Sequence, residues 1–527
     1  MRSVLLVWCF LFTVRCSLRA DQQYWKNLAK KELKEALEVK WNLERAKNVI
    51  IFIGDGMGPN TVTATRIYKG GESHRLIYEN FPHVGLLKTY AADKMVPDSA
   101  CTATALLCGI KANKDTVGVD ARVKRKDCLS SLEPDARLKS LAAMALETGK
   151  SAGFVTTMRV THATPSPLYA HSADRTWECD ANLPPTAATC KDHARQLIED
   201  WPGRDLNVIL GGGRLSLVSS KSRNPNISAT PDIPKNRWVC ARKDGLNLIE
   251  EYMKNKETQG QKYAYVSNRR ELQSFNANET DYLLGIFSDS HLDYEYERDK
   301  GPDGMPSISD MVVAAINVLK KNENGYFLMV EGGNIDMAHH RGRAKVAIEE
   351  AAAMEEAVKV AVDMTDEEDT LLIVTSDHTH TLNINGYPDR GSNIFGTAGA
   401  SPHDGINYTT LAYSTGGPSS FKYYAYTDNQ NRTTVMRQDP TQEETNSVYY
   451  TQNAGIILDE NSHGGGDVII YARGPHSHLF HNIHEQHYVY HAILYAAKMG
   501  PYASSNCCNS FISLAFVIIL TVINIIV

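Results

Sequence analysis

Short apolar runs recur along the chain, and they are the first guide to its fold. The runs are apolar at most positions, without regular alternation of polar and apolar side chains: Asn48–Ile53, Ser151–Val155, Asn207–Leu210, Tyr326–Val330, Thr370–Val374 and Asp467–Ala472. A strand that is apolar along its length is buried on both faces, which is typical of parallel sheets covered by helices. We therefore predict a strand at each run.

Helical patterns lie between these runs. Arg343–Asp363 is rich in Ala, Glu and Val at helical spacing, and a final helix is predicted over His484–Lys498. Gln22–Trp41 has the pattern of an amphipathic helix that packs on the main body or on a partner subunit. The alternation of strands and helices predicts an α/β fold, with a large, mostly parallel sheet flanked by helices on both faces.

The pattern changes between Gly386 and about Glu460. Gly, Pro, Ser, Asn and Tyr are frequent there, and helical periodicity is lost. We interpret 386–460 as an inserted subdomain of irregular or β structure. The α/β domain then comprises 21–385 and 461–500.

Both ends of the chain carry processing signals. Residues 1–20 combine an early arginine, an apolar run and small residues, which is typical of a secretory signal peptide. In 501–527, small residues precede an almost wholly apolar tail, which predicts a GPI-anchor signal with attachment in the region Ser504–Asn506. A C-terminal membrane helix is the alternative.

Composition narrows the class of protein. The chain has 527 residues, a formal net charge of −6 and no basic block, which argues against a nucleic-acid partner. Ten cysteines are too few for a disulfide scaffold, but four in polar segments are candidates for pairing: Cys128, Cys179, Cys190 and Cys240. Four glycosylation sequons fit an extracytoplasmic chain: Asn226, Asn278, Asn407 and Asn431.

Ser99 is the candidate nucleophile. Pro97 and Asp98 precede it, and small helix-compatible residues follow, so we predict a helix start with Asp98 as the cap. The free N–H groups of a helix start suit a bound phosphate. A serine in this position is usually a plain cap, so Ser99 gains its significance from chemistry elsewhere in the chain.

That chemistry lies where the predicted strands end. Carboxylate and imidazole side chains follow several apolar runs, beside very small residues: Asp55, Glu331, Asp336, His340, Asp377, His378 and His463. The carboxyl ends of parallel strands meet at one edge of a sheet, where sites of α/β proteins form. Each of these residues alone is an ordinary cap or ion pair, but together they predict buried carboxylates that need cations as partners.

The residue types indicate which cations. Zinc binds imidazole nitrogen and carboxylate oxygen, whereas the oxygens of Asp55, Thr164 and Glu331 suit a harder ion such as magnesium. Two nearby metal ions can clamp an in-line displacement at phosphorus. Arg175 is the candidate for gripping the phosphate, because a guanidinium binds phosphate oxygens as a fork.

With these residues in place, the chain resembles the alkaline phosphatases, in particular the animal, membrane-anchored type, from Trp25 to Lys498. The resemblance is carried by five motifs: Gly54-Asp55-Gly56-Met57-Gly58, Pro97-Asp98-Ser99-Ala100-Cys101-Thr102-Ala103-Thr104, Glu331-Gly332-Gly333-Asn334-Ile335-Asp336 with His339-His340, Thr375-Ser376-Asp377-His378-Thr379-His380, and Ser462-His463-Gly464-Gly465. It implies a crown-like insert, hydrolysis of phosphate monoesters at alkaline pH through a phosphoserine, a homodimer, and attachment to the extracellular face of the plasma membrane by a lipid anchor.

The resemblance also implies a role for each matching residue. Ser99 would be phosphorylated and Arg175 would bind the phosphate. The expected ligand sets are Asp336, His340 and His463 for one zinc ion, Asp377, His378 and Asp55 for a second, and Asp55, Thr164 and Glu331 for one magnesium ion. His162 would lie next to the magnesium ligands, and His380 beside the second zinc.

Two features depart from the family pattern. Animal relatives often hold calcium near Phe287 and Asp303, but Ser288 replaces the usual carboxylate and the Ile233 region lacks the expected acid, which puts calcium in doubt. Cys128 and Cys190 match a family disulfide. A second family disulfide is not expected because Lys498 occupies one of its positions, and Cys179 with Cys240 is a substitute pair.

Two other functions compete with this one. A related two-metal hydrolase would act on diesters or sulfates, and a surface receptor of the same fold would have no activity. Neither alternative explains a complete set of a serine, an arginine and three groups of metal ligands.

Overall fold

The computed structural model describes residues 22–219 and 239–503. The predicted signal peptide, the anchor region Ser504–Asn506, the sequon at Asn226 and the Ile233 region lie outside the described residues. Helix α1 (Gln22–Glu38) contains no buried residue. None of the helices in the described ranges is long and apolar enough to cross a membrane.

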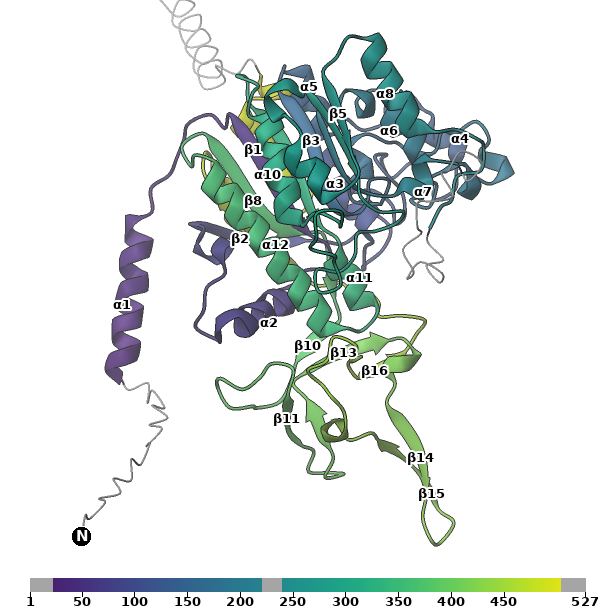
Figure 1. Cartoon of the computed structure of the whole chain (residues 1–527). Helices are drawn as coiled ribbons and strands as arrows, with labels where there is room; N and C mark the ends of the chain where they lie inside the picture. The colour runs from purple at the N-terminus through teal and green to yellow at the C-terminus, as the bar shows by residue number, and fades with distance from the viewer. Residues whose placement is uncertain (1–21, 220–238, 504–527) are drawn as a thin grey trace, which may run out of the picture. The chain divides into compact units, whose positions relative to one another are not determined.

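A ten-stranded sheet forms the centre of the main body, with strand order β19-β2-β18-β8-β1-β7-β3-β4-β6-β5 (Figure 1). All six predicted runs are strands of this sheet: β1 (Asn48–Gly54), β3 (Ser151–Arg159), β4 (Val208–Gly212), β7 (Tyr326–Gly332), β8 (Thr370–Ser376) and β18 (Val468–Arg473). Strands β8, β1, β7, β3 and β4 are parallel neighbours, and β18 is antiparallel to β8. The predicted α/β fold with a mostly parallel sheet is confirmed.

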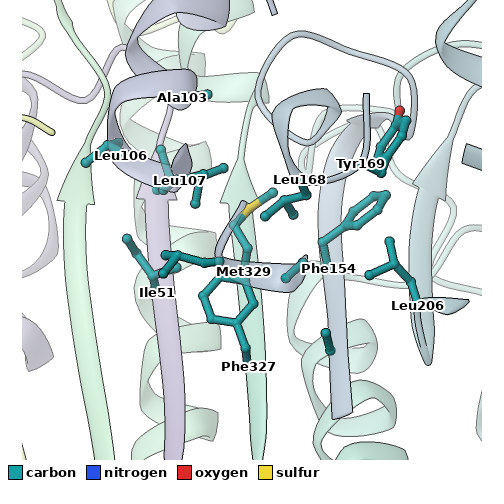
Figure 2. Close-up of a cluster of buried hydrophobic side chains, with 14 of the residues drawn as sticks. Ile51, Ala103, Leu106, Leu107, Phe154, Leu168, Tyr169, Leu206, Phe327 and Met329 are labelled. Carbon is teal, nitrogen blue, oxygen red and sulfur yellow. The ribbon is translucent and has the colours of Figure 1, made fainter. Parts of the chain in front are cut away.

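Helices cover both faces of the sheet because its strands are apolar on both sides. On one face, Ile51 and Met329 pack in a core with Leu106 and Leu107 of α3 (Ser99–Cys108), as Figure 2 shows. On the other face, the alternate residues of the same strands pack against α10 (Ile308–Leu319) and α12 (Ala344–Met364), with Phe52 in that core. The two cores fix α3 and its first residue relative to the strand ends.

The sheet extends further than the sequence pattern predicted. Helix α13 covers only Tyr488–Ala497, because Asn482–Glu485 forms edge strand β19, which hydrogen-bonds in parallel to β2 (His83–Lys88). Strands β5 (Tyr263–Val266) and β6 (Tyr282–Ile286) complete the other edge. Exposed residues alternate with less exposed ones in β2, so no continuous apolar run marks it.

The segment 386–460 contains short strands and two 3₁₀ helices. Its strands β13 (Leu411–Gly416) and β16 (Ala454–Ile457) form a three-stranded sheet with β10 (Leu382–Ile384), and Figure 1 shows this sheet separate from the large one. Two hairpins complete the segment: β11 (Thr397–Ala400) with β12 (Asn407–Thr409), and β14 (Tyr423–Thr427) with β15 (Thr433–Arg437).

Two disulfide bonds are present in the main body, Cys128–Cys190 and Cys179–Cys240. Cys101 and Cys108 are buried thiols of α3. Among the described sequons, Asn278 and Asn431 are exposed and Asn407 is half-buried. Their glycosylation stays a prediction.

Candidate active site

Three parallel neighbours bring three carboxylates to one edge of the sheet. Asp55 directly follows β1, Asp377 directly follows β8, and Glu331 lies near the end of β7. Gly54 pairs in register with Gly332 on one side and with Ser376 on the other, so the carboxylates lie side by side. Strand register therefore gathers residues that are far apart in the sequence.

Ser99 is the first residue of α3, and Asp98 caps the helix as predicted. The Asp98 carboxylate accepts hydrogen bonds from the backbone N–H groups of Ala100 (3.2 Å) and Cys101 (3.5 Å). The Ser99 hydroxyl is 3.1 Å from Nε2 of His378 and 3.4 Å from Oδ1 of Asp55. The helix start thus aims the predicted nucleophile at the strand-end carboxylates.

Arg175 is held beside Ser99 through its neighbour Asp98. Its Nη1 donates to Oδ2 of Asp98 at 2.9 Å, and its Nη2 lies 3.2 Å from Nε2 of His162. Burial opposes ionisation of Asp98, but Arg175 and the backbone N–H of Asp115 outweigh it and lower the pKa of Asp98 to about 2. Asp98 is therefore charged across the physiological range, and it orients the guanidinium.

Three groups of side chains could each hold a metal ion, and within each group the ligand atoms lie within 4.8 Å of one another. Their members are Asp336, His340, His380 and His463 in the first group, Asp55, Asp377 and His378 in the second, and Asp55, His162 and Glu331 in the third. The structure thus brings together all the carboxylate and imidazole residues of the three expected ligand sets. Thr164 is also buried, and its hydroxyl lies beside Glu331, where it opposes the rise in the pKa of that carboxyl. Asp55 belongs to two groups and links them.

His380 lies with the first group, although we expected it beside the second ion. Its Nε2 is 2.5 Å from Oδ1 of Asp336, and its Nδ1 is 2.6 Å from the side-chain oxygen of Asn461. The backbone oxygen of Asn461 also accepts a hydrogen bond from Nδ1 of His340, at 2.7 Å. Asn461 therefore orients two rings of the group, a role that the sequence signalled only by its closeness to His463.

The donor atoms fit cations. Among the described residues, Oδ2 of Asp55, Oε1 of Glu331 and Oγ1 of Thr164 are buried oxygens without a hydrogen-bond partner. Burial raises the pKa of Asp55 well above its ordinary value, and the charges of Asp336 and Asp377 raise it further. Burial likewise raises the pKa of Glu331 to about 7. A hard cation among these oxygens would supply the missing partner, and the imidazole-containing groups match the ligands of zinc.

Gly56 leaves space for two members of the first group, and this gives a testable prediction. Its φ is +67°, and a Cβ at this position would lie 2.6 Å from the ring of His380. We expect Gly56→Ala to displace that ring and Asp336, and to lower the catalytic activity about tenfold or more, as changes around metal ligands do. Measurement of kcat and of thermal stability checks this prediction.

Gly71→Ala is the matched control for Gly56→Ala. Gly71 also has a positive φ, +84°, but a Cβ there would have no neighbour within 4 Å. This substitution should cost about 1–3 kcal/mol of stability, because φ +84° with ψ −178° is a conformation essentially restricted to glycine, and it should leave kcat unchanged. Equal kcat values for the two variants would contradict the proposed crowding at Gly56.

Comparison with known proteins agrees with this geometry. The family model for alkaline phosphatase matches residues 46–499. The chain belongs to the alkaline phosphatase family. It is 43% identical over 491 residues to an alkaline phosphatase of Gadus morhua, an alignment that covers 91% of this chain and 98% of the relative. The tissue-nonspecific isozyme of alkaline phosphatase of Homo sapiens is 43% identical over 490 residues, an alignment that covers 91% of this chain and 89% of the relative.

Two further comparisons extend the picture. A membrane-bound alkaline phosphatase of Bombyx mori is 38% identical over 501 residues, with 92% of this chain and 87% of the relative covered. The solved alkaline phosphatase of Thermus thermophilus has a TM-score of 0.57 and 22% identity, and the match covers 88% of this chain and 93% of that one. The latter comparison supports the fold alone. Membership of the family makes the chain a phosphomonoester hydrolase, so the predicted enzyme class is confirmed.

Ser288 and Asp303, from the region where the resemblance implied calcium in animal relatives, both have contacts within the chain. Asp303 is 77% exposed and pairs with Arg270 at 3.1 Å. The backbone oxygen of Ser288 accepts hydrogen bonds from the N–H groups of Gly213 and Arg214, both at 3.0 Å. None of the three metal-capable groups in the described chain includes Asp303.

Proposed function

We propose that the chain hydrolyses phosphate monoesters at alkaline pH through a phosphoserine on Ser99, with two zinc ions and one magnesium ion. The observation that carries this proposal is the place of the Ser99 hydroxyl, 3.1 Å from His378 and 3.4 Å from Asp55, at a helix start whose cap also binds Arg175. A nucleophile, a phosphate-binding arginine and cation-binding groups therefore share one site.

The ligand sets that we propose combine members of the three metal-capable groups with the buried residue Thr164. Asp336, His340 and His463 would hold one zinc ion, Asp55, Asp377 and His378 the second, and Asp55, Thr164 and Glu331 the magnesium ion, with His380 next to the first set and His162 next to the third. Such ions would supply Lewis acidity, which lowers the pKa of a bound hydroxyl and stabilises negative charge on phosphate oxygens.

The residues of the chain then act in two displacements. Arg175 binds the phosphate oxygens and places phosphorus in front of Ser99, since the Asp98 carboxylate already occupies the N–H groups of Ala100 and Cys101. The deprotonated Oγ of Ser99 forms a bond to phosphorus while the ester bond breaks, and the alcohol leaves with a proton from solvent. Water then attacks the phosphoserine, which releases phosphate and restores Ser99. Two displacements retain the configuration at phosphorus.

Hydrolysis of a chromogenic phosphomonoester at alkaline pH tests the proposal. We expect EDTA to remove most of the activity, because it takes away the cations that the proposed mechanism needs. Added zinc with magnesium should restore the activity. A chromogenic phosphodiester assayed in parallel should react far more slowly. Activity that survives exhaustive chelation would contradict the metal-assisted mechanism, and faster hydrolysis of the diester would favour the diesterase alternative.

We also propose a GPI-anchored homodimer on the extracellular face of the plasma membrane. The sequence of 501–527, the resemblance to membrane-anchored phosphatases and the membrane-bound relative of Bombyx mori support the anchor. Exposed apolar residues on β16, Ile456 and Ile457, support a partner surface. Phosphatidylinositol-specific phospholipase should release the protein from membranes, whereas retention would favour a membrane helix. Sedimentation of the released protein would give its subunit number.

A further inference from the structure

A buried ion pair joins the two segments that carry His162 and Arg175. Arg159, the last residue of β3, binds Glu178 through two hydrogen bonds, Nε to Oε2 at 2.8 Å and Nη2 to Oε1 at 2.6 Å. Their side chains are only 2% and 4% exposed. His162 follows Arg159 by three residues and Arg175 precedes Glu178 by three residues, so the pair clamps together two loops of the active site.

The remaining nitrogen of this guanidinium holds a histidine from a third segment. Nη1 of Arg159 lies 2.8 Å from Nε2 of His291, which follows strand β6 and precedes α10. A guanidinium has only donors, so Nε2 of His291 must accept this hydrogen bond and the ring carries its proton on Nδ1. The contact therefore fixes both the tautomer and the orientation of the His291 ring.

The His291 ring in turn contacts the ring of His162. Their centroids are 5.5 Å apart and their planes lie at 89°, an edge-to-face arrangement. Nε2 of His162 is 3.2 Å from Nη2 of Arg175 and, by the same reasoning, must be an acceptor. A continuous series of contacts thus runs from Glu178 through Arg159, His291 and His162 to Arg175.

We propose that His291 is a positioning residue that keeps the guanidinium of Arg175 in the orientation that binds phosphate. The proposal rests on the proposed role of Arg175 as the phosphate-binding residue. Asp98 fixes only one nitrogen of that guanidinium, Nη1, and His162 fixes Nη2. Without the ring of His291 beside it, the His162 ring can rotate. The Nη2 group of Arg175 then loses its hydrogen bond to Nε2 of His162.

The test is a double-mutant cycle between His291→Gln and Arg175→Ala. Glutamine retains a hydrogen-bond acceptor for Nη1 of Arg159 but removes the ring that contacts His162. The Arg159–Glu178 ion pair therefore stays intact. In the wild-type background we expect His291→Gln to lower kcat/KM for a chromogenic phosphomonoester about tenfold and to raise the Ki of inorganic phosphate by the same factor. In the Arg175→Ala background, His291→Gln should change kcat/KM and the Ki of phosphate by no more than about twofold each. The guanidinium that His291 positions is absent from that background.

Controls separate positioning from folding. Each variant is compared for melting temperature and for bound zinc, which His291→Gln should leave unchanged, and is assayed in excess magnesium because His162 belongs to the third metal-capable group. His83→Gln is the matched control, since His83 is a buried histidine that contacts another histidine, His481, near the far edge of the sheet. It should keep wild-type kinetics. His291→Ala, which removes both acceptor and ring, repeats the cycle and should give at least as large a loss.

The outcomes distinguish this inference from the proposed function. If Arg175→Ala leaves the Ki of phosphate unchanged, the role of Arg175 itself is wrong. If Arg175→Ala weakens phosphate binding but His291→Gln does not, the positioning role is overturned and the proposed function stands. A full tenfold loss from His291→Gln in the Arg175→Ala background would also overturn it, because His291 would then act independently of Arg175.

Discussion

Replacing Ser99 with alanine will lower kcat for phosphomonoesters by about 10³-fold or more, because the variant lacks the oxygen that forms the bond to phosphorus. The hydroxyl lies 3.1 Å from Nε2 of His378 and 3.4 Å from Oδ1 of Asp55, and in the described chain no other hydroxyl contacts both of these side chains. Steady-state kinetics at alkaline pH measure the loss. Acid quenching during turnover of a radiolabelled substrate should trap phosphate on the wild type and none on the variant.

Thr104→Ser in the same helix is the control for Ser99→Ala. The Thr104 hydroxyl donates to the backbone oxygen of Ala100 and accepts from the N–H of Gly118, bonds that serine can also form. This variant should retain wild-type kcat. Radiolabel trapped on Ser99→Ala would contradict the assignment, because the phosphorylated residue would then lie elsewhere.

Replacing Asp55 with asparagine is expected to remove two cations at once. Asp55 belongs to two of the three metal-capable groups, and its Oδ2 is among the buried oxygens without a partner. An amide has the same shape but no charge, so we expect kcat to fall by about 10²-fold or more and bound metal to fall in the same variant. Elemental analysis of the purified protein, together with kcat, checks both results.

Asp369→Asn is the matched control for the Asp55 variant. Asp369 directly precedes β8, at the opposite end of the strand from Asp377, and its carboxylate accepts hydrogen bonds from Asn48 and Thr370. Its replacement should leave metal content and kcat unchanged. An Asp55→Asn protein with full metal content but low activity would show that Asp55 acts on the reaction without holding the ions.

The sequence predicted the parts of the site that depend on strand ends. Asp55 and Asp377 follow continuous apolar runs, which are typical of strands buried on both faces, so the pattern predicts the shared sheet edge. Asp98 was predictable as a cap for a different reason: the residues that indicate a helix start lie next to it in the sequence. The capping bonds to Ala100 and Cys101 confirm it.

The parts that escaped prediction depend on contacts between distant loops. His291 lies in no motif, and only the folded chain places it against His162 and Arg159. His380 follows His378 by two residues, yet its ring lies against Asp336 of another strand connection. Edge strand β19 was not predicted, and its last two residues, His484 and Glu485, were assigned to the final helix, because these residues gain strand structure only by hydrogen-bonding to β2.

The register of β1 with β7 and β8 also sets when the site can form during synthesis. The backbone N–H of Gly56 hydrogen-bonds to Asp377, which lies 321 residues further along the sequence. The Ser99 hydroxyl contacts His378, which lies 279 residues further along. A ribosome that has released only the first half of the chain has therefore exposed Asp55 and Ser99 but neither of the strands that flank β1. The first metal-capable group is therefore complete only after His463 has been synthesised, and β1 is an apolar strand without both of its neighbours until β8 has emerged.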